Sequence, residues 1–199
     1  MSNFNVDSHG GMVTVKPDAL QSYPVLVIDD EPQILKIITR QLETEETLRI
    51  TAVSDPAQAL EALNNSHFAL IISDNKMPQM TGVELLRAAM ERSPHSRRVL
   101  LTGYTDQTAA IQAFNDHVIH RYIDKPWKKS TLLGIVREQL NAYDQQQRDD
   151  AERQELKSKL QRRNQQLRAT LEAARETEDE LGEDSGPVIR HRLAAVAIA

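Results

Sequence analysis

Cysteine is absent from the 199 residues, which excludes disulfide frameworks, cysteine zinc sites and thiol nucleophiles. No apolar run approaches the roughly 18 residues that a membrane span requires. Residues 1–20 also lack the apolar core of a secretory signal peptide. The net charge of -5 weighs against a nucleic-acid partner. We therefore expect a cytoplasmic chain with no membrane association and no direct nucleic-acid binding.

What the sequence does contain is a regular alternation of short apolar runs and segments with helical spacing. Apolar runs predict strands at 25–28, 48–53, 68–72, 99–101 and 118–123. Helical patterns follow at about 31–44, from Pro56, at about 83–92, at about 106–115 and from about Lys128. Five strands that alternate with five helices predict a doubly wound α/β fold, with a parallel sheet covered on both faces.

Polar residues stand where these strands end. Asp29 and Asp30 follow the first strand, Asp74 the third, Thr102 the fourth and Lys125 the fifth. The carboxyl ends of parallel strands share one edge of the sheet, where ligands usually bind. Adjacent acids there repel each other unless a cation joins them. A site that offers oxygen ligands and contains no Cys or His suits Mg²⁺. A carboxylate beside that ion can attack phosphorus.

These residues and their surroundings resemble the receiver domain of bacterial two-component response regulators, the CheY-like fold. The resemblance covers about residues 22–142. It is carried by Val-Leu-Val-Ile-Asp-Asp-Glu at 25–31, Leu-Ile-Ile-Ser-Asp at 70–74 with Met77-Pro78 and Gly82, Leu-Leu-Thr-Gly at 100–103, and Asp124-Lys125-Pro126. It implies a flavodoxin-like strand order of 2-1-3-4-5.

The resemblance also implies a role for each acid. Asp74 would be the phosphoacceptor, and a partner histidine kinase would be the phosphodonor. Asp29, Asp30, Asp74 and the backbone carbonyl of Lys76 would hold Mg²⁺.

Three further residues match the family's switch positions. Thr102 would supply the switch hydroxyl, Lys125 would pair with the phosphate, and Tyr122 would be the aromatic switch residue. The chain is then a signalling phosphoprotein and not itself an enzyme.

Residues 143–181 are highly charged and poor in Gly and Pro, which predicts a long helix continuous with the last helix of the domain. A seam with alternating spacings of four and three residues predicts a parallel homodimeric coiled coil, since a single core Asn favours two strands. Its dimerisation residues are Leu160, Asn164, Leu167, Leu171, Ala174 and Leu181. A solitary charged helix is the alternative.

The expected organisation has four parts. A flexible leader spans 1–21, a receiver domain 22–142 and a coiled-coil linker 143–181. A tail at 182–199 would be either unstructured or the start of a truncated output region.

Three other functions fit parts of this pattern. The chain could be the regulatory portion of a longer kinase, cyclase, phosphodiesterase or phosphatase. It could be an interaction module that is never phosphorylated. A haloacid-dehalogenase-type phosphatase would use the same residue types, but its Asp-x-Asp signature is missing from Asp29-Asp30-Glu31-Pro32.

Overall fold

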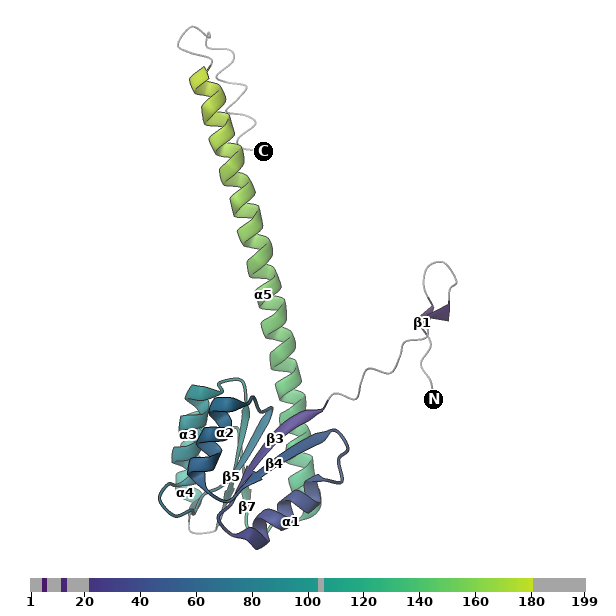
Figure 1. Ribbon diagram of the computed structural model, residues 1–199, viewed down its shortest axis with the longest axis vertical. Helices are drawn as coiled ribbons and strands as arrows, with labels where there is room; N and C mark the ends of the chain where they lie inside the picture. Colours follow the sequence, from purple (N-terminus) through teal and green to yellow (C-terminus); the bar gives the residue numbers. More distant parts are fainter. Residues whose placement is uncertain (1–4, 7–11, 14–21, 104–105, 181–199) are drawn as a thin grey trace. The chain divides into compact units, whose positions relative to one another are not determined.

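The computed structural model describes residues 5–6, 12–13, 22–103 and 106–180, with side chains described for 22–103 and 106–176. Its main feature is a five-stranded parallel sheet of order β4-β3-β5-β6-β7 (Figure 1). The strands are β3 (Tyr23–Ile28), β4 (Leu48–Val53), β5 (Leu70–Asp74), β6 (Arg97–Thr102) and β7 (Arg121–Asp124). Numbered within this sheet, the order is 2-1-3-4-5, so the expected fold is confirmed.

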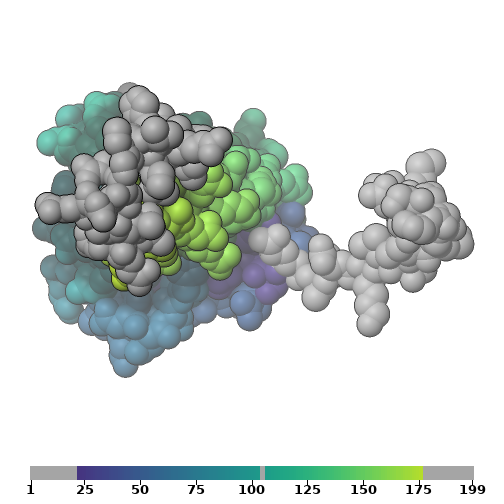
Figure 2. Space-filling model, turned by 90° about the horizontal axis from the view of Figure 1, so that it is seen from above, coloured from purple at the N-terminus to yellow at the C-terminus, as the bar shows by residue number. Residues whose placement is uncertain are grey.

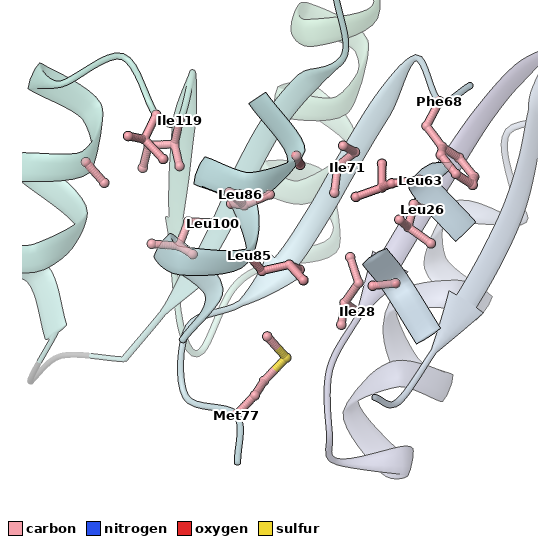
Figure 3. Packing of buried hydrophobic residues seen from close by; sticks show 14 of the residues in the cluster. Leu26, Ile28, Leu63, Phe68, Ile71, Met77, Leu85, Leu86, Leu100 and Ile119 are labelled. Atoms are coloured by element: carbon pink, nitrogen blue, oxygen red, sulfur yellow. The ribbon is translucent and has the colours of Figure 1, made fainter. Parts of the chain in front are cut away.

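Helices cover both faces of the sheet, as the buried residues show. The helices are α1 (Pro32–Leu42), α2 (Pro56–Asn65), α3 (Gly82–Arg92), α4 (Gln107–Asn115) and α5 (Lys129–Glu180). Helices α2, α3 and α4 pack on one face around Leu26, Ile71 and Leu100 (Figure 3). Helix α1 and the first turns of α5 pack on the other face around Val27, Ile72 and Val99.

Local sequence signals explain where two of the helices begin. The Asp55 carboxylate accepts the Ala57 N–H at 2.9 Å and caps α2, which opens with Pro56. At α3, Thr81 and Glu84 form a capping box. Gly82 follows that cap, and a Cβ there would lie 2.0 Å from the carbonyl oxygen of Asp74. Only glycine therefore lets α3 begin so close to the end of β5.

One predicted element differs in extent. The strand expected at 118–123 begins only at Arg121. Val118 and Ile119 are buried in the core between α4 and β7. Apolar residues in a buried connection look the same in the sequence as residues of a strand, which explains the error.

Near the N-terminus, β1 (Asn5–Val6) pairs antiparallel with β2 (Met12–Val13). The sequence analysis did not predict this pair. The other residues of the expected leader, and those of the expected tail at 182–199, lie outside the described residues.

The chain forms two compact units, 1–146 and 147–199. Helix α5 continues without interruption from Lys129 to Glu180, which confirms the predicted long helix. Figure 2 shows the side chains of its later turns, in green and yellow, at the surface. Within the described segments, no helix combines the length and apolar character needed to cross a membrane.

Candidate functional site

Lys125 joins two buried carboxylates at the carboxyl edge of the sheet. Its Nζ lies 2.6 Å from Asp74 Oδ1 and 3.1 Å from Asp29 Oδ2. Asp29 follows β3, Asp74 ends β5, and Lys125 follows β7, so three separate strands supply the cluster. Asp29 is fully buried and Asp74 is 5% exposed. The edge predicted from the strand ends thus brings these three side chains into contact.

Burial and charge shift the ionisation of this cluster. Burial raises the pKa of the Asp29 carboxyl, against the lowering effects of the Glu31 N–H, which donates to it at 2.9 Å, and of Lys125. The nearby charge of Asp74 raises this pKa further. Burial would lower the pKa of Lys125, but hydrogen bonds and charge from Asp74 and Asp29 outweigh it, so the net shift is upward. Lys125 therefore stays charged between the two acids.

The backbone around Asp74 holds its carboxylate in place. The Lys76 N–H donates to Asp74 Oδ2 at 2.8 Å, while Oδ1 faces Lys125. The loop after Asp74 is fixed in turn, because the Asn75 N–H donates to the Leu101 carbonyl and the Gly82 N–H donates to the Asn75 carbonyl, both at 3.0 Å.

Asn75 is a site residue that the sequence analysis missed. It is 7% exposed, and its Oδ1 has no hydrogen-bond partner among the described residues. A buried acceptor without a partner is unfavourable and marks a place where a ligand or water can bind. Only its position directly after Asp74 could have pointed to it.

Asp30 stands apart from the contact between Lys125 and the other two acids. It is half-buried and lines a groove of about 780 Å³ together with Asn75 and Lys76. The Lys76 side chain is largely exposed, and its Nζ lies 3.6 Å from Asp106 Oδ2. The groove runs from the acids toward α3 and α4.

The two predicted switch residues lie near the cluster in different settings. Thr102 is fully buried, and its hydroxyl donates to the Gly103 carbonyl at 3.2 Å. Its own carbonyl accepts the Lys125 N–H at 2.7 Å, which ties the end of β6 to the lysine. Tyr122, on β7, is half-buried and packs against the core under α2, α3 and α4.

The oxygen donors at this edge fit Mg²⁺. No group of three or more His, Cys, Asp and Glu side chains suited to a metal occurs in the part of the chain that the structure describes. Mg²⁺ needs only one or two carboxylates, since water and phosphate complete its octahedron. Asp30, Asp74 and the unpartnered Asn75 Oδ1 are hard oxygen donors of the kind it prefers.

The predicted dimerisation seam is solvent-exposed in the single chain. Leu160 is 62% exposed, and Leu167 and Leu171 are each 51% exposed. Asn164 is also exposed and Ala174 is half-buried. Leu181 lies outside the described residues. Leu156, which the predicted seam omits, is 65% exposed.

Comparison with known proteins supports the resemblance stated from the motifs. The family model described as "Response regulator receiver domain" matches residues 25–137. The hydrogenase transcriptional regulatory protein HoxA of Cupriavidus necator is 36% identical over 118 residues, which cover 59% of this chain and 24% of HoxA. The chain thus spans about a quarter of that relative's length.

Two more proteins illustrate the range of similar molecules. The transcriptional regulatory protein FixJ of Azorhizobium caulinodans is 28% identical to this chain, and the match covers 76% of this chain and 71% of FixJ. A solved structure named as the adenylate cyclase from Rhodopirellula baltica superposes with a TM-score of 0.62 and 28% identity. That match covers 65% of this chain and 95% of the other.

Proposed function

The chain belongs to the response regulator receiver family, and from this premise we propose that Asp74 is its phosphoacceptor in two-component signalling. Receiver domains generally take their phosphoryl group from a histidine kinase and bind Mg²⁺ at the phosphorylation site. The observation that carries the assignment is the contact of Lys125 with both Asp74 and Asp29. It places a fixed positive charge beside the one strand-end carboxylate that the Lys76 N–H also orients.

The transfer reaction can be written in terms of this site. An Asp74 carboxylate oxygen attacks the phosphorus of a kinase phosphohistidine. A P–O bond forms as the P–N bond breaks, and the imidazole leaves and takes up a proton. Lys125 balances charge on the transferring oxygens, and the Thr102 hydroxyl donates to one of them after release from Gly103. Tyr122 would then respond to the new position of Thr102.

Mg²⁺ would be held by Asp29, Asp30, Asp74 and the Lys76 carbonyl, and it would neutralise phosphoryl charge when bound. Asp30 at the rim of the groove and the partnerless Asn75 Oδ1 support this assignment. A kinase that uses ATP also implies the cytoplasm as the compartment.

Acetyl phosphate with Mg²⁺ tests the phosphoacceptor directly by intact mass. We expect the wild type to gain one phosphoryl group and Asp74→Asn to gain none. Asp124→Asn is the matched control, because Asp124 is an exposed acid at the end of β7, two strands away from β5 in the same sheet. A phosphoryl group on Asp74→Asn would disprove the assignment, and no gain by the wild type would favour an unphosphorylated interaction module.

The second part of the proposal is that α5 transmits the state through a parallel homodimeric coiled coil. The exposed leucines of the seam support it, since a stripe of this kind is stable when buried against another helix. The chain lacks cysteine, so a single introduced thiol can form a disulfide only with the same thiol of a second copy. In a parallel coiled coil, Leu167→Cys should form this disulfide. Gln165→Cys, on the outer face of the same turn, should not. Equal crosslinking of both variants would contradict the parallel seam.

A second candidate is the regulatory portion of a longer enzyme. The adenylate cyclase name carried by one similar structure favours it. Reading the coding sequence after residue 199 distinguishes the two, because an in-frame cyclase, kinase, phosphodiesterase or phosphatase domain would support the second candidate. The chain itself should form no cyclic AMP from ATP and Mg²⁺ in either case.

A further inference from the structure

The strands that supply the acid cluster also contact α5 at their opposite ends. Tyr23 begins β3, which leads to Asp29. Arg97 begins β6, which ends at Thr102, and Arg121 begins β7, which leads to Lys125. The segment just before β5, which ends at Asp74, contains His67. Tyr23, Arg97 and Arg121, which begin their strands, and His67, which precedes β5, each contact a side chain of α5.

The contacts fall within just over two turns of α5. Tyr23 Oη donates to Asp144 Oδ2 at 2.6 Å, and His67 Nε2 lies 2.9 Å from the Tyr143 hydroxyl. Arg97 donates from Nε and Nη2 to Gln139 Oε1 at 3.1 and 3.0 Å.

Two further contacts complete this set. Arg121 Nη2 lies 2.6 Å from Glu138 Oε1, and Gln146 Nε2 lies 3.2 Å from His95 Nδ1, just before β6. We call the five α5 residues Glu138, Gln139, Tyr143, Asp144 and Gln146 the clasp.

The clasp lies at the boundary between the receiver domain and the helical linker. The family model ends at residue 137, directly before it, and the first unit of the chain ends at Gln146. Gln139 is 2% exposed, so its amide is a buried polar group held by Arg97. Releasing it would leave buried hydrogen-bonding groups without partners, so the clasp ties α5 firmly to the strands.

The remaining strand provides a contrast. Strand β4 carries no predicted site residue, and the loop before it contacts α5 only one residue ahead of the clasp, where Arg137 Nη2 lies 2.6 Å from Glu45 Oε1. The contacts of the clasp are thus made by the first residues of the strands that lead to the acid cluster (Tyr23, Arg97 and Arg121) and by His67 and His95 in the segments just before β5 and β6.

We propose that the clasp is the device that carries the state of the acid cluster to the coiled coil. This inference rests on the proposed phosphorylation of Asp74. New charge on Asp74 changes the contacts of Lys125, Asp29 and Thr102, and each of these lies at the end of a hydrogen-bonded strand whose other end bonds to α5. A shift of any of these strands changes how firmly α5 is held. The cluster and the clasp are therefore coupled through the sheet.

Amide hydrogen exchange of residues 138–146, with and without acetyl phosphate and Mg²⁺, tests the proposal. In the wild type, phosphorylation should change the amide exchange rates of residues 138–146 by about fivefold or more. Intact mass measures how much of the protein is phosphorylated. The double variant Tyr23→Phe/Tyr143→Phe keeps both rings but removes the hydroxyls that bond to Asp144 and His67. It should gain the phosphoryl group normally, while its exchange response falls to about twofold or less.

Glu45→Gln is the matched control, since it weakens an α5 contact next to the clasp, and it should respond as the wild type does. Arg121→Gln, which breaks a single exposed ion pair, is a milder variant should the double one unfold, and it should reduce the response in part. A phosphorylated wild type with unchanged exchange, or a double variant with the full response, would overturn the clasp alone. A wild type that gains no phosphoryl group would overturn the proposed function and the clasp with it.

Discussion

The carboxyl edge of the sheet, where the strands end, and the amino edge, where they begin, bury charges of opposite sign and stabilise them in different ways. At the carboxyl edge, Asp29 and Asp74 are held by Lys125 and by two backbone N–H groups. At the amino edge, Arg98 is 3% exposed, and its guanidinium donates to the carbonyls of Val118 at 2.7 Å and Ser96 at 2.9 Å. Burial lowers the pKa of Arg98 to about 10.

Under the proposed function, this difference separates a reactive edge from a structural one. The Lys125 side chain is partly exposed, so a metal or a phosphoryl group could replace its contacts with the two acids. Arg98 instead binds the backbone carbonyls of Ser96, just before β6, and of Val118, in the connection between α4 and β7, and these cannot be exchanged without unfolding the segments that carry them. Four substitutions examine this contrast, and they follow in order of expected effect.

The largest effect is expected at the structural edge. Arg98→Met keeps much of the side-chain volume but leaves the buried carbonyls of Ser96 and Val118 without their donor. The free energy of unfolding should fall by about 3 kcal/mol, measured by urea denaturation. Mg²⁺ should not restore it. Recovery in Mg²⁺ would show that the two edges are not independent.

Lys125→Met should have the next largest effect. It leaves Asp29 and Asp74 close together without their cation, and the free energy of unfolding should fall by about 2 kcal/mol in EDTA, allowing for the partial exposure of Lys125. Because a bound divalent ion replaces the missing charge, Mg²⁺ should recover much of this loss. The same deficit with and without Mg²⁺ would count against a metal site here.

A pH effect of about 1 kcal/mol is expected at His120. Its Nδ1 accepts the Arg98 N–H at 3.0 Å, and burial, followed by the charges of Arg97 and Arg98, lowers its pKa from 6.5 to about 3. The unfolded chain therefore binds more protons between these values, so stability falls as the pH drops. From pH 7 to 5 the wild type should lose about 1 kcal/mol more than His120→Asn, after allowance for solvent screening. Parallel pH profiles would contradict this.

The smallest effect is expected for Lys76→Met, at the same edge as Lys125. The Lys76 side chain is 71% exposed and pairs with Asp106 at 3.6 Å. An ion pair of this kind contributes about 0.5 kcal/mol or less, so urea denaturation should barely distinguish the variant from the wild type. A loss as large as that of Lys125→Met would mean that burial does not set the difference between the two lysines.

Much of the fold and of the candidate site could be predicted from periodicity and from strand ends. The apolar runs located all five strands of the main sheet, and the residues after them placed Asp29, Asp74 and Lys125 at one edge. Asn75 could not be predicted, because a polar residue in a loop is usually exposed. Its burial follows from the contact of its loop with the backbone of Leu101 and Gly82.

The amino-acid sequence by itself determined the order of the elements and which residues end the strands, because hydrophobic period and helix caps are local properties. Only the tertiary structure decided that Lys125 bridges two acids, that Arg98 is enclosed by carbonyls, and that α5 bonds to the starts of the strands. Apart from the Arg98 bond to the Ser96 carbonyl, those contacts join residues between 17 and 121 positions apart. Such pairs form only where the packed sheet brings distant segments together.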